Sequence, residues 1–367
     1  MGNNIKNSNI EILRIFAMLM IIAHHYCWHG VYNLCHCNTS LVCYLNNFIV
    51  GIATLGGKLG VDIFILITGY FMISSKYKFS RFIKIYLSTL FYSLLFLMLA
   101  YIFAKQQISQ ITINSSIFPF GGNAYWFITT YLMLYILIPF INNFIHKTKK
   151  SMLNSLMIIT TILWVIIPTF TNANYCFSNL VWFIYLYLVG ASIKLKSFAG
   201  IFNNKNFIKK IFLLSCTILV SYVFIKCVNN QINLVNMEKI SRMQSLYIFS
   251  VAIYLFHFFK DLTITNSMLI NQVSSSVLGV YLIHDNFIVR PFIWLLLFHP
   301  YTMIDKSYMI LHLFTVTLIV FIFCVVIDKF KILIFNKITS LLNKFDTTKI
   351  KKYNRQLIKL MYKFNKI

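Results

Sequence analysis

The chain has 367 residues, of which 59% are hydrophobic and only 11% are charged. A soluble domain carries roughly a quarter of charged residues, so this composition excludes an ordinary soluble protein. The formal net charge of +25 does not indicate nucleic-acid binding, because the basic residues lie at the ends of apolar stretches and in the C-terminal tail. We therefore expect a membrane protein that has no nucleic-acid partner.

Ten apolar stretches approach the length needed to cross a bilayer core of about 30 Å. Every backbone polar group must be satisfied within the protein in lipid, so each stretch is predicted to be a helix. The expected fold class is all-α, a polytopic membrane protein with about ten transmembrane helices. The predicted spans are 10–28, 47–73, 82–104, 124–145, 152–171, 177–193, 207–226, 243–259, 274–298 and 308–330.

Lysine and arginine gather in alternate connections between these spans, after the second, fourth and sixth. The positive-inside rule assigns such connections to the cytoplasm. We therefore expect both termini on the cytoplasmic side of the cell inner (cytoplasmic) membrane. The basic residues of these connections are Lys76, Lys78, Arg81, Lys84, Lys147, Lys149, Lys150, Lys194, Lys196, Lys205, Lys209 and Lys210.

The sequence divides into a transmembrane domain at 1–330 and a tail at 331–367. The tail intersperses lysine and arginine with isoleucine, leucine and phenylalanine. This pattern is typical of a basic amphipathic helix, which would bind anionic membrane lipid on the inner leaflet. A segment that docks onto a partner protein is the alternative.

The eight cysteines do not indicate a disulfide framework. Four of them gather near His29 and His36, but no C-x-x-C pair is present, so a metal site is weakly supported. We expect free thiols, with one disulfide or a metal site as the alternatives. The clustered cysteines are Cys27, Cys35, Cys37 and Cys43.

Arg14 and His25 lie on one stripe of the first predicted helix. They are separated by ten residues, which at about 100° per residue leaves them about 20° apart around the helix and about 16 Å apart along it. Ionisable groups inside a membrane are costly and usually functional. A histidine there could act as a general base or carry an acyl group transiently. The alternatives are an arginine that snorkels to the surface and a histidine that bonds a neighbouring helix.

Asp62 lies in the middle of the second predicted span and needs a partner at that depth. Lys58 precedes it by one turn, and Arg14 or His25 could meet it across the helix interface. The basic residues Lys76, Lys78, Arg81 and Lys84 follow this span. They would meet an anionic ligand at the cytoplasmic mouth, or they could simply set the orientation of the chain.

Two motifs resemble the acyltransferase-3 family of membrane enzymes. That family has an arginine, ten intervening residues and a histidine in its first helix, as Arg14 and His25 do here. The stretch 57–70 resembles the family pattern G-x-x-G-V-x-x-F-F-x-x-S-G-[FY], with Ile65 in place of phenylalanine and Thr68 in place of serine.

Further stretches are similar to the same family. The family often has two arginines three positions apart after the second span, and Lys84 replaces the second of them here, which matters because lysine lacks the planar fork. Tyr125, Trp126 and Phe127, which lead to Pro139, and the stretch 278–284 also look similar.

The resemblance implies an acyl-CoA donor, most simply acetyl-CoA, which comes from the cytoplasm. It implies as acceptor a hydroxyl of a surface glycan, such as capsule polysaccharide, or of a lipid-linked oligosaccharide. The expected catalytic residues are His25, Arg14 and Asp62, and the expected coenzyme A contacts are the four basic residues that follow the second span. No metal is expected. The remaining residues expected to line the substrate cavity are His29, Trp126, Tyr281, His284 and Asp285.

Two other functions are alternatives to an O-acyltransferase. A transporter or flippase of a lipid-linked glycan would show symmetry between its halves and broken helices, and no repeat is visible. A polysaccharide polymerase would have long outer loops, whereas the longest outer connections here have about 20 residues.

Overall fold

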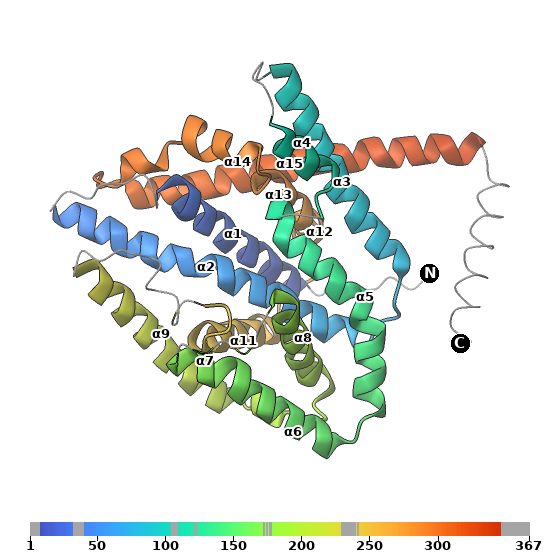
Figure 1. The fold of residues 1–367 in the computed structure, drawn as a ribbon, viewed down its shortest axis with the longest axis vertical. Coiled ribbons are helices and arrows are strands. Elements are labelled where there is room, and N and C mark those ends of the chain that lie inside the picture. Colours follow the sequence, from blue (N-terminus) through green and yellow to red (C-terminus); the bar gives the residue numbers. More distant parts are fainter. Residues whose placement is uncertain are drawn as a thin grey trace.

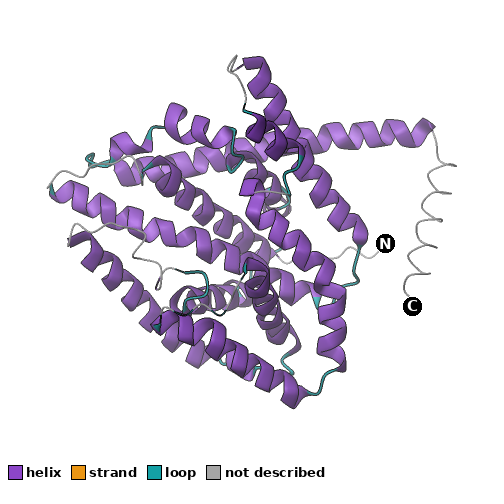
Figure 2. Cartoon of the chain, in the orientation of Figure 1, coloured by secondary structure: helices purple, strands orange, loops and turns teal. Residues whose placement is uncertain are grey.

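The computed structural model describes residues 8–31, 40–103, 109–120, 123–171, 173, 175, 178–228, 240 and 242–345. Over these residues the chain forms helices and no strand (Figure 2), which confirms the predicted all-α class. The elements are α1 (Ser8–Gly30), α2 (Leu41–Met72), α3 (Phe79–Phe103), α4 (Gln110–Ile117), η1 (Asn123–Tyr125), α5 (Trp126–Lys147), α6 (Lys150–Thr161), η2 (Ile162–Ile166), α7 (Ile167–Phe170), α8 (Asn179–Leu195), η3 (Gly200–Asn203), α9 (Lys205–Val228), α11 (Leu246–Asp261), α12 (Met268–Ser274), α13 (Val277–His284), α14 (Val289–Pro291), η5 (Phe292–Leu297), η6 (Pro300–Met303) and α15 (Met309–Phe345).

The protein is a multi-pass membrane protein by the length and composition of its helices. Seven helices in the described part are long and apolar enough to cross a membrane, and an eighth span results if one bent pair counts as a single crossing. All ten stretches predicted from the sequence contain helix. Two of them fall below the length of a full span, because α8 has 17 residues and α11 has 16. The sequence thus located the helices correctly but did not establish ten crossings.

The predicted span 274–298 is not one straight helix, which corrects that expectation. The helices before and after residues 285–288 meet at 90°. The backbone N–H groups of Ile288 and Val289 donate to Oδ1 of Asn286 at 2.9 and 3.3 Å, so the amide side chain starts the second segment. Irregular backbone at membrane depth is tolerated where it is buried in protein or lines a cavity.

Helices α1 and α2 run side by side through the middle of the molecule, with α15 on one side and α9 on the other (Figure 1). Helix α2 also crosses α8 closely, at Gly69 and Gly190. A Cβ at either glycine would overlap the backbone of the facing helix. Small residues let two membrane helices approach closely. Close approach stabilises the pair because helix association in lipid relies on van der Waals packing rather than on the hydrophobic effect.

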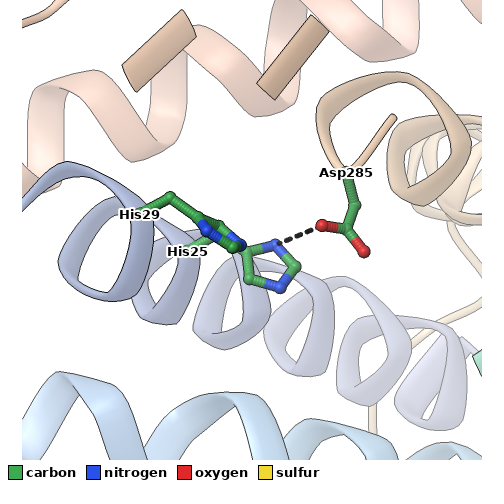
Figure 3. Close-up of side chains that lie close together, drawn as sticks. All are labelled: His25, His29 and Asp285. Carbon is green, nitrogen blue, oxygen red and sulfur yellow. Dashed lines mark ion pairs between the residues drawn. The ribbon is translucent and has the colours of Figure 1, made fainter. Parts of the chain in front are cut away.

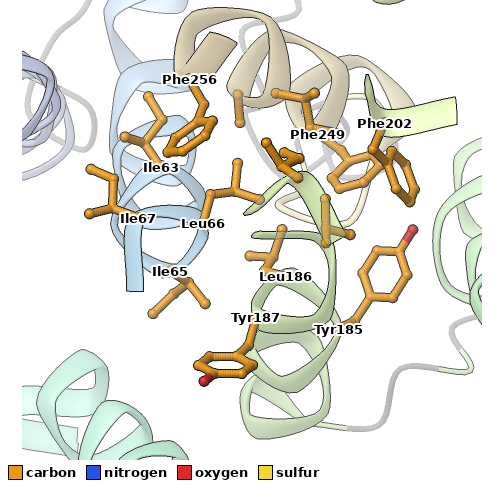
Figure 4. Packing of buried hydrophobic residues seen from close by; sticks show 14 of the residues in the cluster. Ile63, Ile65, Leu66, Ile67, Tyr185, Leu186, Tyr187, Phe202, Phe249 and Phe256 are labelled. Carbon is orange, nitrogen blue, oxygen red and sulfur yellow. The ribbon is translucent and has the colours of Figure 1, made fainter. Parts of the chain in front are cut away.

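The larger apolar core lies where α2, α8 and α11 meet. Leu66, Leu186 and Phe256, one from each helix, are buried in this one cluster (Figure 4). Outer helices instead turn apolar side chains outward, as Phe103 does with 77% of its surface exposed. This inverted surface is what a lipid environment requires.

Helix α15 continues without interruption through residue 330 to Phe345. The expected boundary between a membrane domain and a tail at 330 and 331 therefore lies within one helix. Residues 346–367 of the predicted tail lie outside the described residues.

Candidate active site

A cavity of about 480 Å³ lies between α1, α2, α5 and the α12–α13 segment. Arg14 and His25 both line it, which is the arrangement that their shared helix face predicts. Apolar side chains such as Phe64 and Phe127 form most of the wall between them. The cavity is therefore an apolar passage with a cation toward one end of α1 and an imidazole toward the other.

The glycines of the 57–70 motif bring α1 and α2 together beside this cavity. A Cβ at Gly57 would lie 2.5 Å from Cγ of His24, and one at Gly60 would lie 2.7 Å from the carbonyl oxygen of Ala17. A side-chain rotation would relieve neither clash. The Ala17 oxygen belongs to the backbone, and the His24 ring is held by a 2.6 Å hydrogen bond between its Nδ1 and the Thr54 carbonyl. The motif thus sets the helix spacing that places His24 and His25 at the cavity wall.

Arg14 is oriented at its end of the cavity by an acidic neighbour. Its Nη1 donates to both carboxylate oxygens of Glu11, at 2.9 and 3.1 Å, and the Ser274 hydroxyl also donates to this carboxylate. The Arg14 guanidinium carbon lies 6.0 Å from the centre of the Phe71 ring. One third of the Arg14 side chain remains exposed, so the guanidinium can still bind a ligand.

The four basic residues after α2 are exposed and do not line the cavity: Lys76, Lys78, Arg81 and Lys84. Arg81 nevertheless points back toward the end of α2, where its Nη1 lies 3.4 Å from Sδ of Met72. Met72 is adjacent to Phe71, which packs against Arg14. Arg81 and Arg14 therefore contact neighbouring residues at the end of α2, although neither Phe71 nor Met72 lines the cavity.

His25 is the centre of a polar cluster at the other end. Its Nδ1 lies 3.0 Å from Nε2 of His284 and 3.7 Å from Oδ1 of Asp285. Nδ1 of His284 in turn bonds the Val280 carbonyl at 2.6 Å. Asp285 is paired with Arg290, whose Nη2 lies 2.8 Å from Oδ1. Both of these partners of His25, His284 and Asp285, thus come from the broken helix.

The structure places the other expected cavity residues in two groups. Trp126, Tyr281 and Asp285 line the cavity. His29 and His284 lie outside its lining, and both pack against the His25 ring, with ring centres 5.3 and 5.1 Å from it. These two histidines are placed to act on His25 rather than on a ligand in the cavity.

Asp62 faces away from this cavity, which corrects the expectation that it pairs with Arg14 or His25. Its Oδ1 accepts a hydrogen bond of 2.9 Å from Nε1 of Trp182 in α8. The carboxyl is fully buried on the opposite side of α2 from α1 and is absent from the cavity lining. The partner expected for a carboxyl at this depth in the membrane is therefore the indole of Trp182. Asp62 has no role in the chemistry proposed below.

Sequence reasoning missed Arg290 and undervalued Glu11. Arg290 lies within the ninth apolar stretch, where a cation is a functional signal by the same rule that selected Arg14. Tyr125 was also missed as a support: its hydroxyl donates to the Leu282 carbonyl at 2.9 Å and accepts from Nδ2 of Asn286 at 2.7 Å. That pair holds the break in the helix on which Asp285 lies.

His25, His29 and Asp285 present ligand atoms within 4.8 Å of one another (Figure 3). Two of these three groups already have protein partners, because Nδ1 of His25 bonds His284 and the Asp285 carboxylate pairs with Arg290. A cation would have to compete with a guanidinium for the carboxylate. The expectation of no metal stays a prediction.

Among the described cysteines of the cluster, Cys43 departs from the expectation of free thiols and fits the alternative of one disulfide. Cys43, at the start of α2, is disulfide-bonded, whereas Cys27 is a buried free thiol. Cys35, Cys37 and His36 lie outside the described residues.

Comparison with known proteins identifies one family. Residues 7–329 match acyltransferase family 3, described as an acyltransferase domain. No curated protein and no solved structure gives a significant match.

Proposed function

Because the chain belongs to acyltransferase family 3, we propose that this membrane acyltransferase transfers an acyl group from acyl-CoA to a sugar hydroxyl. In the simplest case the group is acetyl and the acceptor is a cell-surface polysaccharide or its lipid-linked precursor. The observation that carries the proposal is that Arg14 and His25 line one cavity. An anion-binding group and a proton acceptor are thereby joined by one passage.

His25 is the proposed general base. The acceptor O–H bond breaks as the imidazole takes its proton, and the oxygen attacks the thioester carbonyl. The tetrahedral intermediate then collapses, so that the C–S bond breaks and the new ester remains on the sugar. The thiolate of coenzyme A leaves with the proton that His25 held. The neighbouring Asp285 carboxylate, 3.7 Å from Nδ1, stabilises the imidazolium between these steps.

The donor is proposed to enter at the Arg14 end. Coenzyme A carries several phosphate charges, and guanidinium groups bind phosphate through paired, charge-assisted hydrogen bonds. The basic cluster at residues 76–84 begins near this end, since Arg81 contacts Met72 and Arg14 packs against the adjacent Phe71. The distance along α1 from Arg14 to His25 is about 16 Å, which a slender extended arm of the donor could span.

The orientation proposed for the chain has both termini and the 72–84 turn in the cytoplasm of the cell that makes it. The disulfide at Cys43 supports this orientation. Disulfides persist in oxidising compartments and are rare in the cytosol, and Cys43 lies at the opposite end of α2 from the basic turn. The enzyme would then bind its donor from the cytoplasmic side of the inner membrane.

A transporter is the alternative from another class, and the broken helix at residues 285–288 is a feature that it would also show. Among the described residues one helix pair is broken in this way, whereas a transporter with internal symmetry has corresponding breaks in both halves. The observation therefore gives the alternative no independent support.

The test uses the protein in proteoliposomes with radiolabelled acetyl-CoA and lipid-linked oligosaccharide from the producing cell. We expect label in the glycan with wild-type protein and none with His25→Ala. Transport of unlabelled glycan without transfer of label would overturn the proposal. Mass spectrometry of surface glycan from a deletion strain then identifies the acyl group and its position.

A further inference from the structure

His284 has both ring nitrogens committed to hydrogen bonds. Its Nδ1 lies 2.6 Å from the Val280 carbonyl oxygen, and its Nε2 lies 3.0 Å from Nδ1 of His25. The residue is fully buried, so it cannot reach an acceptor sugar or the donor. Its chemistry must therefore act through His25.

The carbonyl fixes the tautomer of His284. A carbonyl oxygen only accepts, so Nδ1 of His284 must carry the proton in the Val280 bond. In the neutral ring Nε2 then has the lone pair, and it can only accept from Nδ1 of His25. The same logic passes to the next ring, because a neutral His25 that donates from Nδ1 has its lone pair on Nε2.

From this chain we infer that His284 is a positioning residue, which holds His25 in the tautomer with its proton on Nδ1. The atom that takes the proton of the acceptor hydroxyl is then Nε2 of His25. The inference deepens the proposed function and rests on it for its kinetic consequence. A backbone carbonyl, through a second histidine, does here what a buried carboxylate does for the histidine of a serine hydrolase.

Asp285 does not replace His284 in this role. Its Oδ1 lies 3.7 Å from Nδ1 of His25, beyond hydrogen-bond distance, and the same oxygen lies 2.8 Å from Nη2 of Arg290. It contributes charge near the ring rather than a directed bond. When Nε2 of His25 takes the proton, Nδ1 keeps its own, so the bond to His284 persists in the imidazolium and the ring need not turn between the two proton transfers.

Two substitutions separate the tautomer from packing. His284→Gln keeps an acceptor, the amide oxygen, for Nδ1 of His25, whereas His284→Leu keeps volume but has none. His257→Leu is a matched control. His257 is also buried, and its Nε2 bonds a backbone carbonyl, that of Phe202, at 2.7 Å. It belongs to α11 and does not line the cavity.

The first measurement is the ¹⁵N spectrum of histidine-labelled protein in nanodiscs, which distinguishes protonated from bare ring nitrogens. The chain has nine histidines, and the His25 signals are those absent from His25→Gln. We expect a protonated Nδ1 and a bare Nε2 in wild type and in His257→Leu, and mixed tautomers in His284→Leu. A wild-type His25 protonated on Nε2 would overturn the inference, whether or not the protein transfers acyl groups.

The second measurement is steady-state transfer from acetyl-CoA. His284→Leu should lower kcat by roughly 10²-fold, the lower range for losing general-base action, with the KM for acetyl-CoA unchanged. His284→Gln should recover part of kcat, and His257→Leu should keep it. Full kcat in a folded His284→Leu variant would refute the positioning role, whereas absence of transfer by wild-type protein would refute the proposed function and leave the spectrum to decide the tautomer.

Discussion

Gly279 of α13 lies directly against the carboxylate of Asp328 in α15, where the Cβ of an alanine would overlap the carboxylate oxygen. Asp328 cannot move aside easily. Its Oδ1 accepts from the Tyr92 hydroxyl at 2.8 Å and lies 2.7 Å from Nζ of Lys331. This contact joins α3, α13 and α15 one turn and a half before His284.

Gly279→Ala should therefore destabilise the protein by about 1–3 kcal/mol, as overpacking of a close contact does. It should also lower acyl transfer, since α13 must shift and it bears His284. Thermal unfolding in detergent measures the first effect. Gly200→Ala is the control, because a Cβ at Gly200 meets no atom within 4 Å. Equal stability of the two variants would show that the contact does not constrain α13.

His25→Ala should abolish acyl transfer while the protein still inserts and folds. Removing a general base typically costs 10²–10⁴-fold in rate. Labelled transfer to glycan in proteoliposomes measures the loss, and gel filtration in detergent checks the fold. Near-normal transfer by a well-folded variant would exclude His25 as the base and as an acyl carrier alike.

Arg81→Ala combined with Lys84→Ala should raise the KM for acyl-CoA by about tenfold or more, because each charge-assisted hydrogen bond contributes roughly 1.5–3 kcal/mol when formed. The KM for the glycan should not change. Lys149→Ala combined with Lys150→Ala is the control, since these exposed cations belong to another basic connection. Equal effects of the two pairs would mean that these residues serve orientation only.

Asp62→Asn should keep acyl transfer within about a factor of two of wild type, because the amide oxygen can still accept from Nε1 of Trp182. Asp62→Leu should instead lose stability by about 1–3 kcal/mol, the cost of leaving the buried indole N–H without a partner. Unfolding and transfer assays on both variants decide the matter. Loss of kcat in a stable Asp62→Asn variant would return Asp62 to the catalytic residues.

Helical periodicity predicted the part of the site that lies on one helix. Arg14 and His25 share a face whatever the rest of the chain does, because the geometry of α1 alone fixes that relation. The contact between His25 and His284 joins residues 259 positions apart, and no local pattern reports it. Asp62 shows the same limit, since depth in the membrane implied a partner but could not select Trp182 among several candidates.

The break in the ninth stretch was missed for a related reason. Apolar residues flank residues 285–288 on both sides, so a hydropathy average over the whole stretch predicts one span. The signals against a straight helix were Asp285, Asn286 and Arg290, which are costly in lipid unless they meet protein partners. Asp285 and Arg290 pair with each other, and Asn286 bonds Tyr125 of another element. The sequence therefore indicates polar residues that need partners, but not the bend that brings the partners together.

Arg14 supplies the last prediction, in which lysine should replace it only in part and alanine not at all. The Arg14 side chain has two separate roles, an ion pair with Glu11 and the proposed binding of the donor. Its Nη1 bonds both oxygens of Glu11, at 2.9 and 3.1 Å, and the rest of the guanidinium is exposed to the cavity. A lysine can form the ion pair with Glu11, but one compact ammonium cannot also present a planar fork to a phosphate.

Arg14→Lys should therefore keep the fold and raise the KM for acyl-CoA, whereas Arg14→Ala should also leave the buried Glu11 carboxylate without its cation and lose stability. Glu11→Gln tests the separation, because it weakens the ion pair but leaves the fork free, so it should disturb stability more than the KM for the donor. Donor kinetics and thermal unfolding on the three variants give the comparison. If Arg14→Lys matched wild type in both, Arg14 would be an anchor at the end of α1, and the donor would have to be held elsewhere.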